Sequence, residues 1–311
     1  MTAMVVLLGF TFTRIRRDVY QNILVLLAVL LPCSIIVDFL YPGFFYSMDS
    51  ASVVWGRAAA TFINANNASE AILIVFILAC PSVPKKYRSP LIMLCGLGVL
   101  LTFSRAAMAT WLVIFAYLLI RRKVYRVSAV IALIVVSAPL LIGGMENYLR
   151  QRSDLDQSIE NIENRLSFFS RRRLDDDSAI ERAAVLQAGW EAFVRNPVTG
   201  IGAGVTMHES RAWPYHASTH NELAILAAEY GLPGVLAWCW LGICLMRGSY
   251  FQDKDFQKLM VVFFLVMTPF THNMFDLPYW LLTFMLVARQ PARTENATPV
   301  PVTGFAVKRN V

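Results

Sequence analysis

Arginine and histidine side chains are the residues of this chain best suited to chemistry on an anionic group. The polar stretch 144–221 carries nine arginines, no lysine and three of the four histidines. A guanidinium group binds phosphate and other planar anions through two parallel hydrogen bonds, which an ammonium group does not. The same stretch holds eleven acidic residues, so the alternative is a solvated loop whose charges neutralise one another.

Two further arginines interrupt apolar sequence. Arg105 lies between two short apolar runs, and Arg57 precedes a run whose first residues include Asn64, Asn66 and Glu70. An ionisable residue within a membrane protein is a candidate for function. The alternative is snorkelling, in which the charged group reaches water while its stem stays in lipid. We expect Asn64, Asn66 and Glu70, near the start of the run that follows Arg57, to face the bundle interior or a wet cavity.

The histidines are compatible with two kinds of site. His216 and His220 have the i, i+4 spacing of two metal ligands on one helix. However, Pro214 and the Ser-Thr pair before His220 argue against a continuous helix there. His220 precedes the point where the chain re-enters apolar sequence, so we favour a general base or hydrogen-bond donor. We therefore expect no metal site.

A glycine-rich segment, Gly200-Ile201-Gly202-Ala203-Gly204, could present backbone N–H groups to a diphosphate. It follows a helical pattern and Asn196-Pro197 rather than a strand, which argues against a dinucleotide-binding fold. The alternative for this segment is an ordinary glycine turn. We keep Gly202 as a candidate for contact with substrate.

Composition identifies the elements that must position these residues. The chain has 311 residues, of which 57% are hydrophobic and 16% charged. A soluble domain of this length cannot bury so much apolar side chain. The net charge of +7 comes without a basic face interleaved with aromatic residues, which argues against nucleic-acid binding. We expect an all-α polytopic membrane protein, a helical bundle in contact with membrane lipids. The predicted apolar runs are 3–13, 21–40, 58–80, 90–103, 106–120, 124–143, 222–246, 259–271 and 275–288.

The basic residues between these runs predict orientation. Five clusters hold 17 lysines and arginines, whereas the remaining short connections hold only Arg57 and Arg105. Basic clusters mark the cytoplasmic side, so each stretch between two clusters must cross the membrane an even number of times. The clusters are Arg14, Arg16 and Arg17; Lys85, Lys86 and Arg88; Arg121, Arg122, Lys123 and Arg126; Arg247, Lys254 and Lys258; and Arg289, Arg293, Lys308 and Arg309.

The even number of crossings between clusters has two consequences. Residues 90–120 and 259–288 must each form a hairpin of short helices, since a single helix over 90–120 would be about 45 Å long. Their tips, at Ser104-Arg105 and Thr271-His272-Asn273, would face the periplasm. We therefore divide the chain into N-terminal transmembrane helices, one large periplasmic loop containing short amphipathic helices, C-terminal transmembrane helices and a disordered cytoplasmic tail. These parts cover residues 1–143, 144–221, 222–288 and 289–311. Within the loop, residues 154–170 and 178–195 have the apolar spacing of amphipathic helices, and Asn196-Pro197 would end the second helix. The apolar positions of that helix include Ile180, Ala184, Leu186, Trp190 and Phe193.

Several ordered motifs resemble the O-antigen ligase/polymerase family. They are Arg182 to Trp190, Asn196 to Gly204, His220-Asn221 and Glu229-Tyr230-Gly231-Leu232-Pro233-Gly234. Upstream, Leu101 to Arg105 is similar to the Ser-Arg element of that family, and Gly56-Arg57 through Asn64-Ala65-Asn66 to its Arg…Asn-Asn element. The resemblance covers roughly residues 50–288. Family members usually have several more helices before the Arg…Asn-Asn element, so we expect a short variant, a mis-started reading frame or a fragment.

The resemblance implies a GT-C-like glycosyltransferase of the bacterial inner membrane that needs no metal, cofactor or nucleotide sugar. Its donor would be a glycan linked to undecaprenyl diphosphate, and its active site would face the periplasm. A ligase would use the lipid A core as acceptor, and a polymerase a second lipid-linked glycan. The implied catalytic residues are His220, Arg105 and Arg182. The candidate substrate-binding residues are Arg57, Asn64, Asn66, Gly202, Arg211 and His272.

Two other functions fit parts of the pattern. Short helices with polar residues and an outer vestibule also suit a transporter of an anionic solute. Against transport, the runs 106–120 and 124–143 carry few polar residues toward the cytoplasmic side. The third possibility is a non-catalytic scaffold of a polysaccharide assembly complex. The sequence leaves the sugar, the acceptor and the oligomeric state open.

Overall fold

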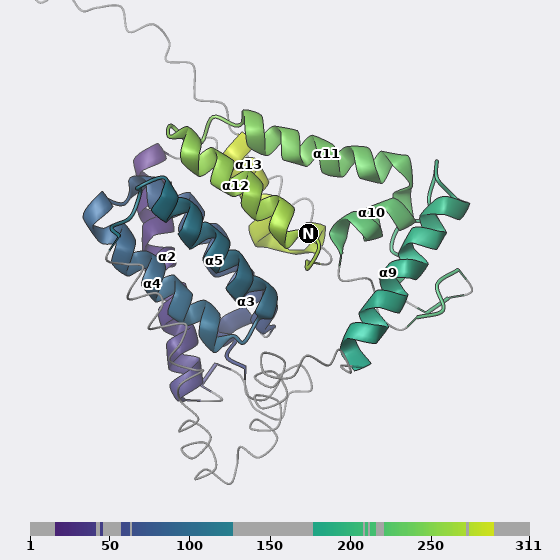
Figure 1. The fold of residues 1–311 in the computed structure, drawn as a ribbon, viewed down its shortest axis with the longest axis horizontal. Helices are drawn as coiled ribbons and strands as arrows, with labels where there is room; N and C mark the ends of the chain where they lie inside the picture. Colours follow the sequence, from purple (N-terminus) through teal and green to yellow (C-terminus); the bar gives the residue numbers. More distant parts are fainter. Residues whose placement is uncertain are drawn as a thin grey trace, which may run out of the picture.

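The computed structural model describes residues 16–41, 44–45, 57–62, 64–126, 177–207, 209–210, 212–215, 221–271 and 274–288. All regular elements within these ranges are helical (Figure 1). The predicted span 3–13, nearly all of 124–143, the predicted helix 154–170 and the C-terminal tail lie outside them. The α-helices are α2 (Arg17–Leu40), α3 (Ala65–Ala79), α4 (Lys85–Leu101), α5 (Arg105–Ile120), α9 (Asp177–Arg195), α10 (Glu222–Tyr230), α11 (Leu232–Arg247), α12 (Lys254–Met267) and α13 (Pro278–Ala288). The short 3₁₀ helices are η1 (Ala60–Phe62), η2 (Cys80–Ser82), η4 (Val205–Met207) and η5 (Met274–Asp276).

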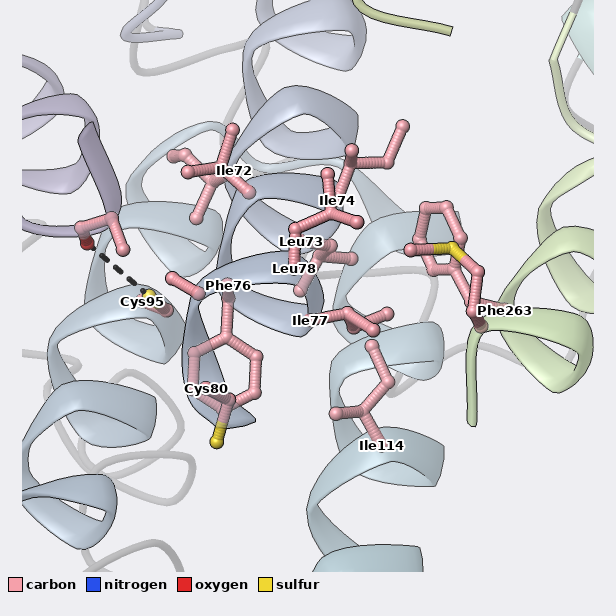
Figure 2. Close-up of a cluster of buried hydrophobic side chains, with 14 of the residues drawn as sticks. Ile72, Leu73, Ile74, Phe76, Ile77, Leu78, Cys80, Cys95, Ile114 and Phe263 are labelled. Atoms are coloured by element: carbon pink, nitrogen blue, oxygen red, sulfur yellow. Dashed lines mark hydrogen bonds between the residues drawn. The ribbon is translucent and has the colours of Figure 1, made fainter. Parts of the chain in front are cut away.

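Helix α3 forms the centre of the apolar core. Its side chains from Ala68 onward are buried, and they pack against α2, α4, α5, α12 and α13. Figure 2 shows Ile72, Phe76 and Ile77 of this helix among side chains of the neighbouring helices. This helix is therefore the rigid element against which residues near its first turn are positioned.

The basic clusters of four chain segments meet at one end of the bundle. Arg17 Nη2 donates to the Tyr250 carbonyl at 2.6 Å, and the Arg88 guanidinium lies 5.2 Å from the centre of the Phe256 ring. Lys123 Nζ lies 2.5 Å from Asp253. The starts of α2, α4 and α12 and the end of α5 thus share this end, which we call the basic end.

Both predicted hairpins are present. Helix α4 ends at Leu101 and α5 begins at Arg105, so their connection lies opposite the basic end. Helix α12 has 14 residues and α13 has 11. A Cβ on Gly248, just after α11, would lie 2.2 Å from the Val287 carbonyl oxygen, so α13 returns to the basic end. The cytoplasmic location of that end stays a prediction from the distribution of charge.

The predicted single span 222–246 is wrong, because it is divided into α10 and α11 at Gly231. This residue has φ +64° and ψ −143°, a conformation that essentially only glycine adopts. A Cβ there would also lie 2.6 Å from the Pro197 carbonyl oxygen. The following Leu232 N–H donates to the same oxygen at 2.7 Å, which fixes the start of α11 against the end of α9.

Helix α9 confirms the predicted helix over 178–195 and its end before Asn196-Pro197, but its buried face differs from the expected one. Val185 and Ala192 are buried on the side of α10. Leu186 and Trp190, which the apolar spacing assigned to the buried face, are 42% and 62% exposed. The spacing identified an apolar sector of the helix, and the bundle covers only part of that sector.

Among the residues that the structure describes, two helical segments are long and apolar enough to cross a membrane, namely α2 and Ala65–Ser82. Helices α5 and α11 and residues Pro278–Val287 are apolar but shorter. Helix α2 exposes much of its apolar surface, whereas α3 is enclosed by the bundle. Exposed apolar residues on such a helix are typical of contact with lipid or a partner. They are Val19, Ile23, Leu26, Val29, Leu30, Val37 and Leu40.

Candidate functional site at the hairpin tips

Arg57 joins three segments at the end of the bundle opposite the basic end. Its Nε donates to the carbonyl oxygen of Thr102 at 2.8 Å, and its Nη2 donates to Asn66 Oδ1 at 2.6 Å. The backbone N–H of Ala58 adds a hydrogen bond of 3.3 Å to the Leu101 carbonyl. The segment before η1 is thus held against both the α4–α5 tip and the first turn of α3.

Two side-chain caps fix the backbone around Arg57. Asn64 precedes α3, and its side chain accepts from the Asn66 N–H at 2.9 Å, as a helix N-cap does. Asp38, near the end of α2, accepts from the N–H groups of Ala59 and Ala60, each at 2.9 Å. Sequence reasoning missed Asp38, although a carboxyl group within the apolar run 21–40 is itself a signal of a polar contact.

The α4–α5 tip is a tight turn that ends at Arg105. Thr102 Oγ1 donates to the Val99 carbonyl at 2.6 Å and accepts from the Ser104 N–H at 3.3 Å. Phe103 has φ +50°, a left-handed conformation uncommon outside glycine. Arg105 is then the first residue of α5 and is half-buried. Arg57 donates to Thr102. The predicted Arg…Asn-Asn element and the predicted Ser-Arg element are therefore in contact.

The α12–α13 tip packs against α3 through polar contacts. Glu70, a buried residue of α3, accepts hydrogen bonds from the hydroxyl groups of Thr271 and Tyr279. The Tyr279 ring also lies 6.3 Å from the ring of Phe62 in η1, measured between centroids. The burial of Glu70 confirms the expectation that it faces the bundle interior, whereas Asn64 and Asn66 are exposed at the end of α3.

The start of α10 contacts the same tip. The Glu222 N–H donates to the Thr268 carbonyl at 3.1 Å, and Glu222 Oε2 accepts from the Met274 N–H at 2.9 Å. Asn221 caps α10 by accepting from the Ala224 N–H at 3.1 Å. The chain that is described from Asn221 onward therefore starts beside the α12–α13 tip, which contacts Glu70.

The glycine-rich segment folds around Glu229 of α10. Glu229 accepts from the N–H groups of Gly204 at 2.8 Å and Thr206 at 3.1 Å, and from the Thr206 hydroxyl at 2.5 Å. The Gly202 N–H donates to the Glu229 carbonyl at 3.0 Å. A Cβ on Gly200 would lie 2.3 Å from that carbonyl. The segment therefore serves as a turn, and a role of Gly202 toward substrate stays a prediction.

Residues 90–239 match the family model described as O-antigen ligase. This segment is similar to the O-antigen ligase family. The match begins in α4, includes α5, α9 and α10, and ends in α11. A comparison of the chain with curated proteins finds no match. This similarity suggests glycan transfer of the O-antigen ligase type, and the apolar helices agree with a location in a membrane.

The O-antigen ligase segment contains part of the predicted site. Arg105, Arg182, Gly202, Arg211 and His220 lie within the match, whereas Arg57, Asn64, Asn66, Glu70 and His272 lie outside it. Arg182 is in the second turn of α9, and its side chain is outside the described part of the structure. Arg211, His220 and His272 are outside the described residues, as are His208 and His216. The structure thus brings Arg57 and Asn66 together with the turn that leads to Arg105.

Proposed function

We propose that the protein transfers a glycan from undecaprenyl diphosphate to an acceptor at the periplasmic face of the bacterial inner membrane. The observation that carries the proposal is the contact of Arg57 with Asn66 and with the carbonyl of Thr102, beside Arg105. These groups lie opposite the basic end, in a chain whose central segment is similar to the O-antigen ligase family. The predicted topology would turn this end toward the periplasm.

The chemistry needs a group that stabilises negative charge. In the transfer, an acceptor hydroxyl oxygen bonds to the anomeric carbon, the bond to the diphosphate oxygen breaks, and the diphosphate leaves with the electron pair. Guanidinium groups in a partly dehydrated site stabilise the charge that develops. We assign this role to Arg105 and Arg182, with Arg57 as a third group. His220 would accept the proton of the acceptor hydroxyl.

The other predicted residues would hold the substrates. Asn64, Asn66, Arg211, His272 and Gly202 are our candidates for contacts with the donor or acceptor. The donor chemistry is the same for a ligase and a polymerase, which differ in the acceptor, either the lipid A core or a second lipid-linked glycan. Glycan gels of a deletion strain separate the two. Lipid-linked polymer that fails to reach lipid A indicates a ligase, and single repeat units on the core indicate a polymerase.

The decisive experiment is transfer by the purified protein in lipid nanodiscs, with a defined undecaprenyl-diphosphate glycan and candidate acceptors. We expect Arg105→Ala and His220→Ala to accumulate normally but to lose roughly 10²–10³-fold in rate, as for loss of an anion-stabilising donor. Arg16→Ala is the matched control, because Arg16 is exposed before α2 and pairs with Asp18. Full activity of either site variant would remove that residue from the mechanism. Anion uptake by vesicles without glycan transfer would instead support a transporter.

A further inference from the structure

Glu70 is a buried carboxyl group with both oxygens engaged by one hairpin. Its side chain is within the core of the bundle, and the whole residue is 3% exposed. Oε1 accepts from the Thr271 hydroxyl, and Oε2 accepts from the Tyr279 hydroxyl at 2.6 Å. Thr271 follows α12 and Tyr279 lies in the first turn of α13. One residue of α3 therefore holds both arms of the α12–α13 tip.

Stability alone does not account for a carboxyl group at this position. The next residues of α3, Ile72, Leu73 and Ile74, are almost completely buried and apolar. Burial of a carboxyl group is costly even when hydrogen bonds satisfy it, and apolar replacements of buried polar groups are often neutral or stabilising. A satisfied polar group does, however, specify a single arrangement, because any other leaves a buried group without a partner.

The arrangement that Glu70 specifies relates two parts of the proposed site. Asn66 and Glu70 are four residues apart on α3, so they share one face of the helix. Asn66 holds Arg57, whereas Glu70 holds Thr271, the residue before His272. The contact between the rings of Phe62 and Tyr279 is a second link between these parts. A shift of the hairpin along α3 would change the distance between the Arg57 element and the tip.

We propose that Glu70 is a positioning residue, which sets the α12–α13 tip against the Arg57–Asn66 element for glycan transfer. The inference rests on the proposed function. Glu70 acts through Thr271 and Tyr279, which engage its two oxygens, and it does not contact substrate, because it is buried within the bundle. Misplacement of a reacting group by about 1 Å costs up to roughly 100-fold in rate, so loss of the two contacts should reduce kcat more than it raises KM.

The test compares two buried polar groups at opposite ends of the bundle. Glu70→Leu removes both contacts, and Glu70→Gln keeps one acceptor oxygen. The matched control is Gln257→Leu, because Gln257 is 4% exposed at the basic end. Its Nε2 donates to the carbonyls of Met246 at 2.6 Å and Gly248 at 2.7 Å. The thermal midpoint, kcat and KM for the lipid-linked donor are measured on purified, folded protein in nanodiscs.

We expect kcat of Glu70→Leu to fall at least about 10-fold, with KM within about threefold of wild type. Glu70→Gln should be intermediate, and Gln257→Leu should lower the thermal midpoint without lowering kcat. If Glu70→Leu does not fold, Thr271→Val combined with Tyr279→Phe removes the same contacts and should lower kcat in the same way. Normal kcat in the folded variants, or an equal fall in Gln257→Leu, would overturn the inference while leaving the proposed function intact. A wild-type protein that transfers no glycan would overturn both.

Discussion

Arg57 and Asn66 are joined by a hydrogen bond of 2.6 Å between Nη2 and Oδ1, across the turn that precedes α3. An amide oxygen holds a guanidinium group in place without adding negative charge. A carboxylate at the same position would hold it as well and would also neutralise it. The amide of Asn66 therefore leaves the positive charge of Arg57 available to an anionic ligand. Replacing this amide by a carboxylate tests whether Arg57 binds the donor.

Asn66→Asp should preserve the contact and weaken donor binding. The added charge a few ångströms from Arg57 is worth roughly 1–4 kcal/mol near a protein surface, so KM for the lipid-linked donor should rise about tenfold or more. Gln252→Glu is the control, because it adds the same charge on an exposed residue near the basic end. Steady-state kinetics in nanodiscs measure both. An unchanged KM in an active Asn66→Asp protein would exclude Arg57 from anion binding.

Glu229→Ala should destabilise the protein, since it leaves the N–H groups of Gly204 and Thr206 without their acceptor. Each buried group left unsatisfied costs about 1–3 kcal/mol, so the thermal midpoint in detergent should fall by several degrees. Glu191→Ala is the same change on the exposed part of α9, where Glu191 pairs only with its helix neighbours among the contacts described. That control should shift the midpoint little. Equal midpoints for the two variants would contradict the anchoring role of Glu229.

Gly231→Ala should impair folding, because its backbone conformation excludes a side chain and a Cβ would meet the Pro197 carbonyl oxygen at 2.6 Å. We expect a marked loss of folded protein by size-exclusion chromatography. Gly242→Ala offers a matched comparison within α11, where the nearest atom to a Cβ, in the Phe264 ring, is 3.6 Å away. That variant should behave like wild type. Normal folding of Gly231→Ala would mean that α10 and α11 form one continuous helix, as the apolar run alone indicates.

The features that the sequence predicted well depend on charge and on local chemistry. Basic residues do not cross a membrane readily, so the clusters at Arg88 and Lys123 were sufficient to predict the α4–α5 hairpin. The apolar run 58–80 predicted α3, although the helix begins only at Ala65, after its N-cap Asn64. The distribution of basic residues placed Arg57 and Arg105 on the same outer side, and the family resemblance assigned both to one site.

The features that the sequence did not predict depend on contacts between distant segments. Glu70 and Thr271 are 201 residues apart, and nothing local to either residue identifies the other. The break at Gly231 was missed because the apolar sequence continues through it. The backbone conformation of Gly231 depends on a contact with Pro197, which hydropathy does not reveal. The contact of Glu229 with the glycine turn was missed because its partners, Gly204 and Thr206, are more than 20 residues away in the sequence. A glycine-rich segment has similar composition whether its N–H groups bind a ligand or a side chain of the same protein.

Asp255 should give the basic end a stability that depends on pH. It accepts hydrogen bonds from Arg121 at 2.6 Å and 2.8 Å, lies 3.0 Å from Lys123 Nζ, and precedes the predicted span 259–271. The hydrogen bond from Arg121 lowers the pKa of Asp255 below its ordinary value, with a further contribution from Lys123. A carboxyl group whose folded-state pKa is lowered stabilises the fold above its unfolded pKa of about 3.9, and the stabilisation is lost as pH falls through the folded value.

Asp255→Asn should therefore lower the thermal midpoint at pH 7 and reduce the loss of stability as pH falls below about 4. Thermal unfolding in detergent, recorded at each pH for wild type and variant, measures the difference. The pair lies at the surface, with the Arg121 side chain about half exposed, so salt at about 1 M should shrink the difference at pH 7 by screening. Parallel pH profiles for the two proteins would show that Asp255 contributes nothing to holding α5 against α12, and the basic end would then depend on apolar packing around Phe256.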